Sequence, residues 1–409
     1  MPSKLAKPSL VVDVSPLWEL QYTGISNVVL ELARRFLDNA DPEFDVDFTV
    51  FHQMVSGSLV DECIAGRSGA PLRRLFEADP PPTVASWLTQ QPRPTAGLHL
   101  HRKPAERLFD FETQLYYDLS FLSVPECHTA DTIDYHSRGL VSQVMTTDRF
   151  FVISEATARD LNFYFEIDPA KVEVAYLGPH VNEETCRAVS GRLSHLKVEK
   201  YLLCLGTIEP RKNVRIILAW LHRNPDVMDT YRFVFVGREG WGESFEEILV
   251  EYALEEYAAA GRIVHFGYIS ESQKDALMLS ASGLIYPSLF EGFGLPVLEA
   301  MALGVPIASS CSTSLPEVLG CQGIYFDPYS VDSFDAAMKT LIGEDLTGQY
   351  RARSAALKIR AAEFTYDRCF QVIVESLKEN YFRVRNRASE PRRIKKKARS
   401  GLSRVKAVT

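Results

Sequence analysis

Short apolar runs of strand length alternate with segments of helix length through the C-terminal half of this chain. The expected strands are residues 201–205, 232–236, 263–266, 283–287, 307–310 and 323–326, and the expected helices are residues 214–221, 244–260, 271–280, 295–303 and 330–342. Strands that alternate with helices pair in parallel through right-handed crossovers. The pattern therefore predicts a doubly wound α/β domain, in which ligands bind at the carboxyl ends of the strands.

The N-terminal half begins with the same alternation. Residues 9–14 and 44–51 are predicted to be strands, and residues 28–37 between them have helical apolar spacing. Residues 54–110 contain prolines and glycines without clear periodicity, so we expect loops and short helices there, with room for an acceptor site. Strand and helix signals resume at residues 149–165.

These signals predict two Rossmann-like domains that face each other across a cleft. The expected parts are a first domain over residues 1–190, a second over residues 200–365, a final helix over residues 366–382 and a tail over residues 383–409. Composition becomes polar around residues 190–200, where we place the linker between the domains.

Composition bounds the compartment and the class of the protein. The 409 residues are enough for two domains of ordinary size. There is no run of about 18 apolar residues that would predict a membrane span, and the first nine residues lack the apolar core of a signal peptide. The seven cysteines are dispersed, without a C-x-x-C pair, which is typical of reduced thiols. We therefore expect a cytoplasmic protein without a metal site.

Charge is distributed unevenly along the chain. Residues 383–409 hold eleven Lys or Arg and one acid, a net charge of +10, so the remaining 382 residues carry −18. Such a segment is either a solvated tail or an attachment to an anionic membrane surface, at about 1 kcal/mol per nearby basic residue. The segment lacks aromatic residues and the body is acidic, so we expect no nucleic acid partner.

Residues 283–306 carry most of the chemical information. The expected strand over residues 283–287 is followed by a glycine turn, Gly292 to Gly294, and by a helix over residues 295–303 with Pro296 in its first turn. Free N–H groups and the positive end of the helix dipole would face outward at this turn. The arrangement therefore predicts a phosphate site.

Two carboxylates flank the predicted phosphate site. Glu291 precedes the turn, where we expect the mouth of the cleft, and Glu299 lies about one turn into the helix. This arrangement suits a ligand that has hydroxyl groups on both sides of a phosphate, as a nucleotide sugar has. Taken alone, this spacing is more often that of an ordinary helix with one acid near its cap and one partly buried acid.

The segment resembles the signature of retaining GT-B glycosyltransferases of family 4. The resemblance extends in register over about residues 200–380 and more weakly over the N-terminal half. Its further landmarks are Gly206-Thr-Ile-Glu-Pro-Arg-Lys-Asn213, Leu315-Pro-Glu-Val318 and Tyr325-Phe-Asp-Pro328. The resemblance implies a GT-B fold with an acceptor-binding first domain, a second domain that binds the nucleotide sugar, and a final crossover helix that packs back onto the first domain.

The resemblance also implies an activity, namely transfer of a sugar from a nucleotide-sugar donor to a glycan or lipid-linked acceptor. Similarity to bacterial mannosyltransferases of polysaccharide assembly makes mannose from GDP-mannose the first choice. No cofactor or metal ion is implied, since the nucleotide sugar is a substrate. The basic tail would place the enzyme on the inner face of the plasma membrane. A sugar-nucleotide epimerase on the same fold and a catalytically inactive nucleotide-sugar-binding subunit are the alternatives.

The expected catalytic residues are Glu291, Asp118, Arg211 and Lys212. Arg211 and Lys212 would stabilise the negative charge that develops on the leaving diphosphate. The family usually has a further arginine directly after the turn glycine, where this chain has Thr207. The pair Asp45 and Asp47 matches the metal-binding D-x-D of another class of glycosyltransferases, but it lies within an alternating strand and is discounted.

The resemblance places several further residues around the donor. They are Gly24, Gly237, Phe266, Tyr268, Phe293, Gly294, Leu295 and Glu299, with Glu299 on the ribose and the backbone near Phe266 to Tyr268 on the base. An ordinary strand–helix connection explains any single turn glycine equally well.

The segment Tyr117-Asp118-Leu119 departs from the pattern. Many relatives have His-Asp-Leu, with the histidine close to the transferred sugar, and this chain has Tyr117 instead. The change would alter hydrogen bonding to the sugar. It is also the reason that a catalytically inactive subunit stays among the alternative functions.

Overall fold

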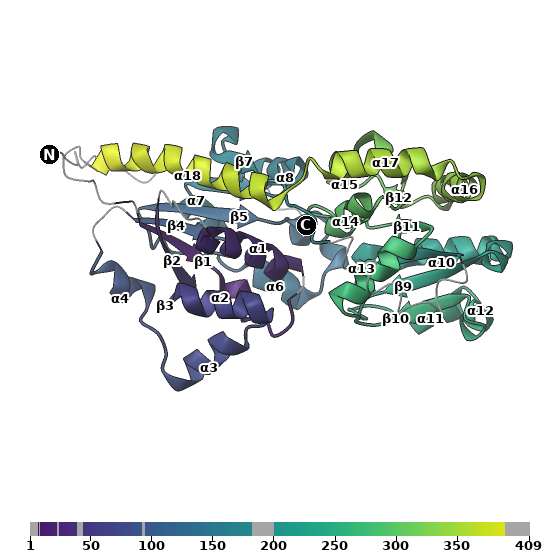
Figure 1. Cartoon of the computed structure of the whole chain (residues 1–409), viewed down its shortest axis with the longest axis horizontal. Coiled ribbons are helices and arrows are strands. Elements are labelled where there is room, and N and C mark those ends of the chain that lie inside the picture. Colours follow the sequence, from purple (N-terminus) through teal and green to yellow (C-terminus); the bar gives the residue numbers. More distant parts are fainter. Residues whose placement is uncertain are drawn as a thin grey trace.

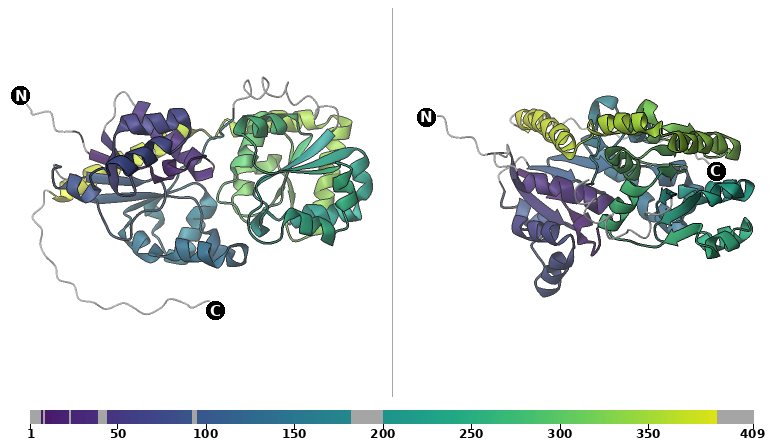
Figure 2. Two further views of the ribbon diagram at one scale, coloured as in Figure 1. Left: turned by 90° about the horizontal axis from the view of Figure 1, so that it is seen from below. Right: turned by 45° about the vertical axis from the view of Figure 1, so that its right-hand side comes forward.

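The computed structural model describes residue 7 and residues 9–22, 24–38, 44–91, 95–181 and 200–388. Figure 1 shows two α/β halves side by side, one built from the purple and blue part of the chain and the other from the teal and green part. Figure 2 shows the same two bodies from two further directions, with helices around the strands of each. The predicted GT-B architecture of two Rossmann-like domains is confirmed. The linker expected around residues 190–200 lies outside the described residues up to position 199.

The first half contains a seven-stranded sheet in the order β3-β2-β1-β4-β5-β6-β7. All neighbouring strands are parallel except the hairpin of β2 and β3. Its strands are β1 (Ser9–Asp13), β2 (Asp45–Val50), β3 (Gln53–Val55), β4 (Thr95–His99), β5 (Phe111–Tyr116), β6 (Arg149–Val152) and β7 (Val172–Val174). Its helices are α1 (Gly24–Asp38), α2 (Gly57–Gly66), α3 (Ala70–Ala78), α4 (Val84–Leu88), α5 (Ser120–Ser123), α6 (Ala130–Ser137), α7 (Leu140–Thr146) and α8 (Glu155–Phe165).

The expectation of loops and short helices over residues 54–110 was wrong for β4, which lies at the centre of the sheet. Every residue of β4 and of β5 is buried, so neither strand shows the alternation that identifies a half-exposed strand. The polar residues of β5 make this strand still harder to identify from the sequence. Glu112 forms a fully buried ion pair with Lys103, at 2.6 Å, and Thr113 donates a hydrogen bond to the carbonyl of Gly97.

The second half contains a six-stranded parallel sheet in the order β10-β9-β8-β11-β12-β13, the doubly wound order expected from the sequence. Its strands are β8 (Lys200–Leu205), β9 (Tyr231–Val236), β10 (Ile263–Phe266), β11 (Gly283–Tyr286), β12 (Ile307–Ser310) and β13 (Ile324–Phe326). Its helices are α10 (Val214–Arg223), α11 (Phe245–Glu251), α12 (Glu255–Ala259), α13 (Glu271–Ser280), α14 (Leu295–Leu303), α15 (Leu315–Leu319), α16 (Val331–Thr347) and α17 (Tyr350–Ala361).

The single helix expected over residues 244–260 is two helices, α11 and α12. Ala253 between them has a φ of +52°, a left-handed conformation that ends α11. Helix α16 continues five residues beyond its expected end at Ile342, and α17 follows it without having been predicted.

The last helix, α18 (Tyr366–Ala388), runs back along the first half, as the yellow helix in Figure 1 shows. It packs on α1, where the rings of Phe36 and Phe370 are 4.8 Å apart and Arg35 pairs with Asp367 at 2.8 Å. Residues 383–388 of the expected basic tail belong to this helix, and residues 389–409 lie outside the described part of the chain. None of the helices within that part has the length and apolar character that a bilayer span requires.

Candidate active site

The helix that carries the predicted phosphate site has the expected bounds. Helix α14 begins at Leu295, with Pro296 in its first turn, and ends before Gly304. Gly294 at the N-cap has a φ of +96°, and a Cβ there would lie 2.6 Å from the Leu315 side chain. The left-handed backbone therefore favours a glycine at the entry to α14, and a larger residue would also have to displace the Leu315 side chain.

A cavity of about 400 Å³ opens at the N-terminus of α14. It lies at the carboxyl ends of three parallel strands of the second sheet, and α1 of the first half closes it from the other side. Its lining includes Gly24, Gly206, Thr207, Gly237, Arg238, Tyr268, Lys274, Leu295, Pro296 and Glu299. Five of the residues predicted to contact the donor therefore lie together, so we refer to this space as the donor cavity.

The turns after β8 and β9 approach each other closely at the donor cavity. A Cβ on Gly237 would lie 2.0 Å from the carbonyl oxygen of Gly206, which only glycine avoids. The Gly237 N–H donates to the carbonyl of Phe266 at 3.0 Å. The backbone of Phe266 thus holds the turn in place, and Phe266 does not line the cavity as Tyr268 does.

Glu299 lines the donor cavity and has an ion-pair partner that sequence analysis did not predict. It is buried, and Lys274 of α13 donates to it at 2.7 Å. Burial raises the pKa of the Glu299 carboxyl, and the Lys274 ammonium only partly opposes this rise. No pattern in the sequence pairs these two residues, because α13 and α14 meet only through the tertiary fold.

Glu291 is not at the mouth of the cleft, contrary to expectation. It is buried and accepts a hydrogen bond from Lys212 at 2.5 Å, while Arg211 lies 3.7 Å from its second oxygen. Burial opposes ionisation, but Lys212 and Arg211 outweigh it, so the pKa of Glu291 is lowered. The structure thus brings together three predicted catalytic residues as one ion cluster, which lies outside the lining of the donor cavity.

Arg211 makes two hydrogen bonds in addition to its contact with Glu291. It donates to the carbonyl of Phe290 at 3.0 Å and to Glu209 at 2.8 Å. It also lines a second cavity, of about 240 Å³, together with Asp118 of the first half. Arg211 therefore faces the junction between the two halves.

The glycine turn before α14 contacts the first half directly. A Cβ on Gly292 would lie 2.3 Å from the carbonyl oxygen of Tyr117 and 3.0 Å from the Asp118 side chain. Phe293 is buried between the rings of Tyr176 and Phe364, with centroids 6.2 and 5.9 Å away. The turn thus joins the halves, and the Phe293 side chain belongs to the core instead of the donor cavity.

Tyr117 and Asp118 follow β5 and are tied to their own half. The Tyr117 hydroxyl donates to the carbonyl of Leu100 at 2.9 Å, and Asp118 accepts from the N–H of Ser120 at 2.9 Å. Both residues line the second cavity and neither lines the donor cavity. The departure at position 117 is therefore accommodated by a backbone hydrogen bond within the first half.

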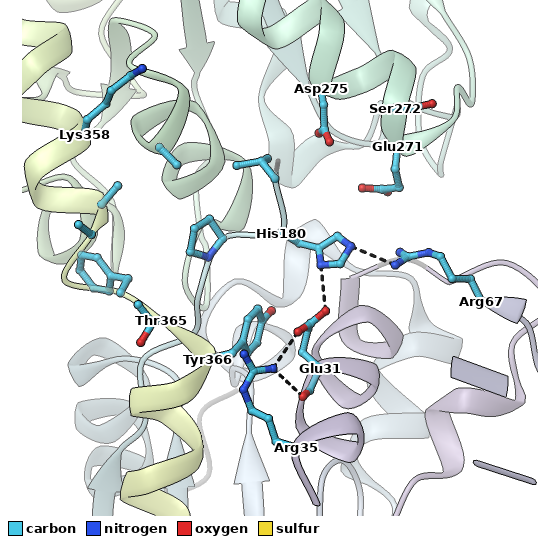
Figure 3. A pocket seen from close by; sticks show the side chains of 16 residues that line it. Glu31, Arg35, Arg67, His180, Glu271, Ser272, Asp275, Lys358, Thr365 and Tyr366 are labelled. Atoms are coloured by element: carbon cyan, nitrogen blue, oxygen red, sulfur yellow. Dashed lines mark hydrogen bonds and ion pairs between the residues drawn. The ribbon is translucent and has the colours of Figure 1, made fainter. Parts of the chain in front are cut away.

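A network of charged residues borders the donor cavity where the halves meet. Figure 3 shows His180 between Glu31 and Arg67 in a neighbouring cavity of about 750 Å³. Arg67 can only donate, so His180 Nε2 accepts at 3.0 Å and the protonated Nδ1 faces Glu31 at 3.2 Å. Burial opposes the ionisation of Glu31, but His180 and Arg35 outweigh it and lower its pKa to about 2. Sequence analysis missed this network, which joins elements distant in the chain.

Metal ligands do not cluster in the described part of the chain, where no group of three or more His, Cys, Asp or Glu could hold a metal ion. Asp45 and Asp47 lie on β2, and burial and the neighbouring Asp45 carboxylate raise the pKa of Asp47.

Comparisons with known proteins agree with this architecture. Residues 191–357 match the family described as glycosyl transferases group 1. The chain is 30% identical to O-antigen chain mannosyltransferase B of Escherichia coli over 64% of its own length and 69% of that protein. It is 27% identical to O-antigen chain mannosyltransferase RfbU of Salmonella typhimurium over 47% of its own length, which is only about half (49%) of that relative.

Solved structures share the fold. A sucrose-phosphate synthase from Thermosynechococcus elongatus superposes with a TM-score of 0.64 at 14% identity, covering 92% of this chain and 100% of that one. The Anabaena protein HepE, in complex with UDP-glucose, superposes with a TM-score of 0.64 at 15% identity, covering 91% of this chain and 99% of that one.

Proposed function

The chain belongs to the group 1 glycosyltransferases, and on that premise we propose that it transfers mannose from GDP-mannose, with retention of configuration, to a glycan or lipid-linked saccharide. The names of the O-antigen mannosyltransferases to which it is similar support mannose as the sugar. The observation that carries the proposal is the donor cavity, where a buried carboxylate, glycine turns and a helix N-terminus lie together beside the ion cluster of Arg211, Lys212 and Glu291.

In this proposal each part of the site has one task. Glu299 accepts hydrogen bonds from the ribose hydroxyls, and the diphosphate lies at the N-terminus of α14, where the helix dipole favours negative charge. Arg211 and Lys212 stabilise the charge that develops as the diphosphate leaves. These fixed cations provide the stabilisation for which other enzymes use a metal ion, so we propose that no metal is needed.

Retention is proposed to proceed without a covalent enzyme intermediate. Glu291 is buried and bound to two cations, which makes its carboxylate a poor nucleophile and a good fixed acceptor for a sugar hydroxyl. The acceptor hydroxyl would attack the sugar from the face that the diphosphate leaves. The bond from the sugar carbon to the phosphate oxygen breaks, and the departing phosphate takes the hydroxyl proton.

The test is a transfer assay with purified full-length protein. GDP-mannose, UDP-glucose and UDP-galactose are each supplied with a mannose-terminated acceptor, and the anomeric configuration of the product is read by NMR. We expect turnover with GDP-mannose and an α-linked product. Epimerised sugar formed without acceptor would identify the epimerase instead, and GDP-mannose binding without turnover would identify the inactive subunit.

We propose that the basic segment places the enzyme at an anionic membrane surface. Residues 383–409 hold eleven Lys or Arg and one acid, whereas the body is acidic. Because exposed charges are screened beyond about 8 Å at physiological salt, binding to anionic vesicles should fall steeply with added salt. Deletion after Phe382 removes all eleven of these basic residues, so it should abolish vesicle binding while transfer to a soluble acceptor remains. Undiminished vesicle binding by the truncated protein would place the contact elsewhere.

A further inference from the structure

Helix α8 of the first half is capped by a carboxylate from the second half. Glu317 of α15 accepts hydrogen bonds from the backbone N–H groups of Glu155, at 2.6 Å, and Ala156, at 3.2 Å. These are the first two residues of α8, and the side chain of Ser154 before them accepts from the N–H of Thr157 at 3.0 Å. Two of the N–H groups that a helix leaves without an internal partner are therefore satisfied across the junction of the halves (Figure 1).

The chemistry of this cap makes it strong. A carboxylate is favoured at the positive end of a helix dipole, and hydrogen bonds to a charged acceptor are roughly twice as strong as neutral ones. Ala156 is 6% exposed, so water cannot readily take the place of Glu317 there. Arg360 of α17 donates to the backbone carbonyls of Glu317 and Val318 at 2.9 and 3.3 Å, which fixes the backbone that carries the carboxylate.

The segment that carries Glu317 also holds the backbone of Glu291. Thr313 Oγ1 accepts from the N–H of Glu291 at 3.0 Å and donates to its carbonyl at 2.8 Å. Ser314 Oγ donates to the same carbonyl at 2.9 Å, and Glu317 follows in the first turn of α15. Residues 313–317, which we call the α15 entry segment, therefore contact both Glu291 and the first half.

On the other side of the junction, α8 holds the loop that carries Asp118. Thr157 Oγ1, in the first turn of α8, donates to the carbonyl of Tyr117 at 3.1 Å. The same carbonyl oxygen lies 2.3 Å from where a Cβ on Gly292 would be, and Gly292 directly follows Glu291. The contacts thus close a circuit that runs from Glu291 through the α15 entry segment, α8 and Tyr117 to Gly292.

We propose that Glu317 is a positioning residue, which caps α8 across the junction and thereby fixes Asp118 of the first half relative to Glu291 of the second. The inference rests on the proposed transferase function, because it takes these two residues to border the reaction. Glu317 lines neither the donor cavity nor the cavity at Asp118, so it acts through α8 and the α15 entry segment and not on a substrate. Misplacing reacting groups by about 1 Å can cost about 10² in rate, which sets the size of the expected effect.

The experiment compares full-length wild type with Glu317→Ala, Glu317→Gln and Ser330→Ala. Ser330→Ala is the matched control, because it removes a helix cap that lies within the second half, where the Ser330 side chain accepts from the N–H of Ser333 at 3.1 Å. Amide hydrogen exchange, read by mass spectrometry, maps protection in the first turn of α8 and at residues 117–120. Calorimetry measures GDP affinity, and steady-state rates give kcat and the KM for GDP-mannose.

We expect Glu317→Ala to lose protection in the first turn of α8 and at residues 117–120, while the last turn of α8 keeps it. Its kcat should fall by about ten- to a hundredfold, whereas GDP affinity and the KM for GDP-mannose should stay at wild-type values. Glu317→Gln should be intermediate, because its amide oxygen still accepts one bond while its NH₂ group faces the other N–H. Ser330→Ala should lower the melting temperature and keep wild-type kcat.

Three results would overturn the inference. Wild-type kcat in Glu317→Ala, with protection of α8 lost, would make the cap merely structural. Wild-type exchange at residues 117–120 would show that the cap does not reach Asp118, and a loss of GDP affinity in step with kcat would place the effect at the donor cavity. If Glu317→Ala does not fold, Glu317→Gln is judged by the same three results. If wild type turns over no nucleotide sugar, the proposed function fails, while the exchange map still decides whether Glu317 holds α8 and the Asp118 loop.

Discussion

Replacing Lys212 by methionine should damage both the fold and the chemistry, because Lys212 is the nearer of two cations on a buried carboxylate. At an effective dielectric constant of about 20, unit charges 2.5 Å apart attract by about 7 kcal/mol. Arg211 at 3.7 Å remains, and Lys212 no longer has to be desolvated, so we expect a net loss of about 3 kcal/mol in the free energy of unfolding. Turnover should fall by about 10², the order for losing one preorganised donor to developing charge.

A double variant separates the two effects. Lys212→Met with Glu291→Gln removes the ammonium and the carboxylate together, so urea unfolding should return most of the lost stability. Initial rates with GDP-mannose should stay low, because the charge on the leaving diphosphate still lacks its cation. Wild-type turnover in the single variant would remove Lys212 from the site. Recovery of turnover in the double variant would show that the single variant failed only through its fold.

Three other perturbations test the remaining assignments. Glu299→Gln should weaken GDP binding by about tenfold, whereas Glu291→Gln should leave GDP affinity nearly intact and depress turnover; equal losses of GDP affinity would contradict the assignment. Activity should survive excess EDTA, and loss that manganese restores would revive Asp45 and Asp47 as metal ligands. The Glu31 carboxylate, with a pKa lowered to about 2, stabilises the fold above about pH 4.5 and loses that contribution as pH falls toward 2. Urea unfolding of Glu31→Gln should therefore show about 3 kcal/mol less stability at pH 7 and less loss between pH 4.5 and 2 than wild type. If the stability of Glu31→Gln depended on pH as that of wild type does, the role assigned to the Glu31 carboxylate would be refuted.

The sequence predicted those strands in which an apolar run is bounded by polar, glycine or proline residues. Strand β11 and helix α14 are separated by a glycine turn and a proline, which are local signals, so the structure confirms the helix residue for residue. Strand β4 has no such contrast, because all five of its residues are buried. Length and turn signals cannot identify a strand that is buried on both faces and therefore lacks an alternation of polar and apolar residues.

Some features of the site, like some of the strands, could be predicted from the local sequence, and others could not. The residue types and their spacing along the chain predicted a phosphate site at the N-terminus of α14 and placed Glu299 about one turn into that helix, since turn, dipole and helix position are properties of one short segment. Glu291 belonged to that segment too, yet the lowered pKa of its buried carboxyl depends on Lys212 and Arg211, which come from the turn after β8.

What the sequence by itself determined is therefore the alternation of strands and helices, the turn glycines and the acidic body with its basic end. Only the tertiary structure decided which charges meet. Lys274 pairs with Glu299, and His180 pairs with Glu31. Gly292 fits against the carbonyl of Tyr117. In each case the two residues come from different elements of the fold. Such pairings depend on distances of a few ångströms between segments far apart in the chain, and no local propensity encodes them.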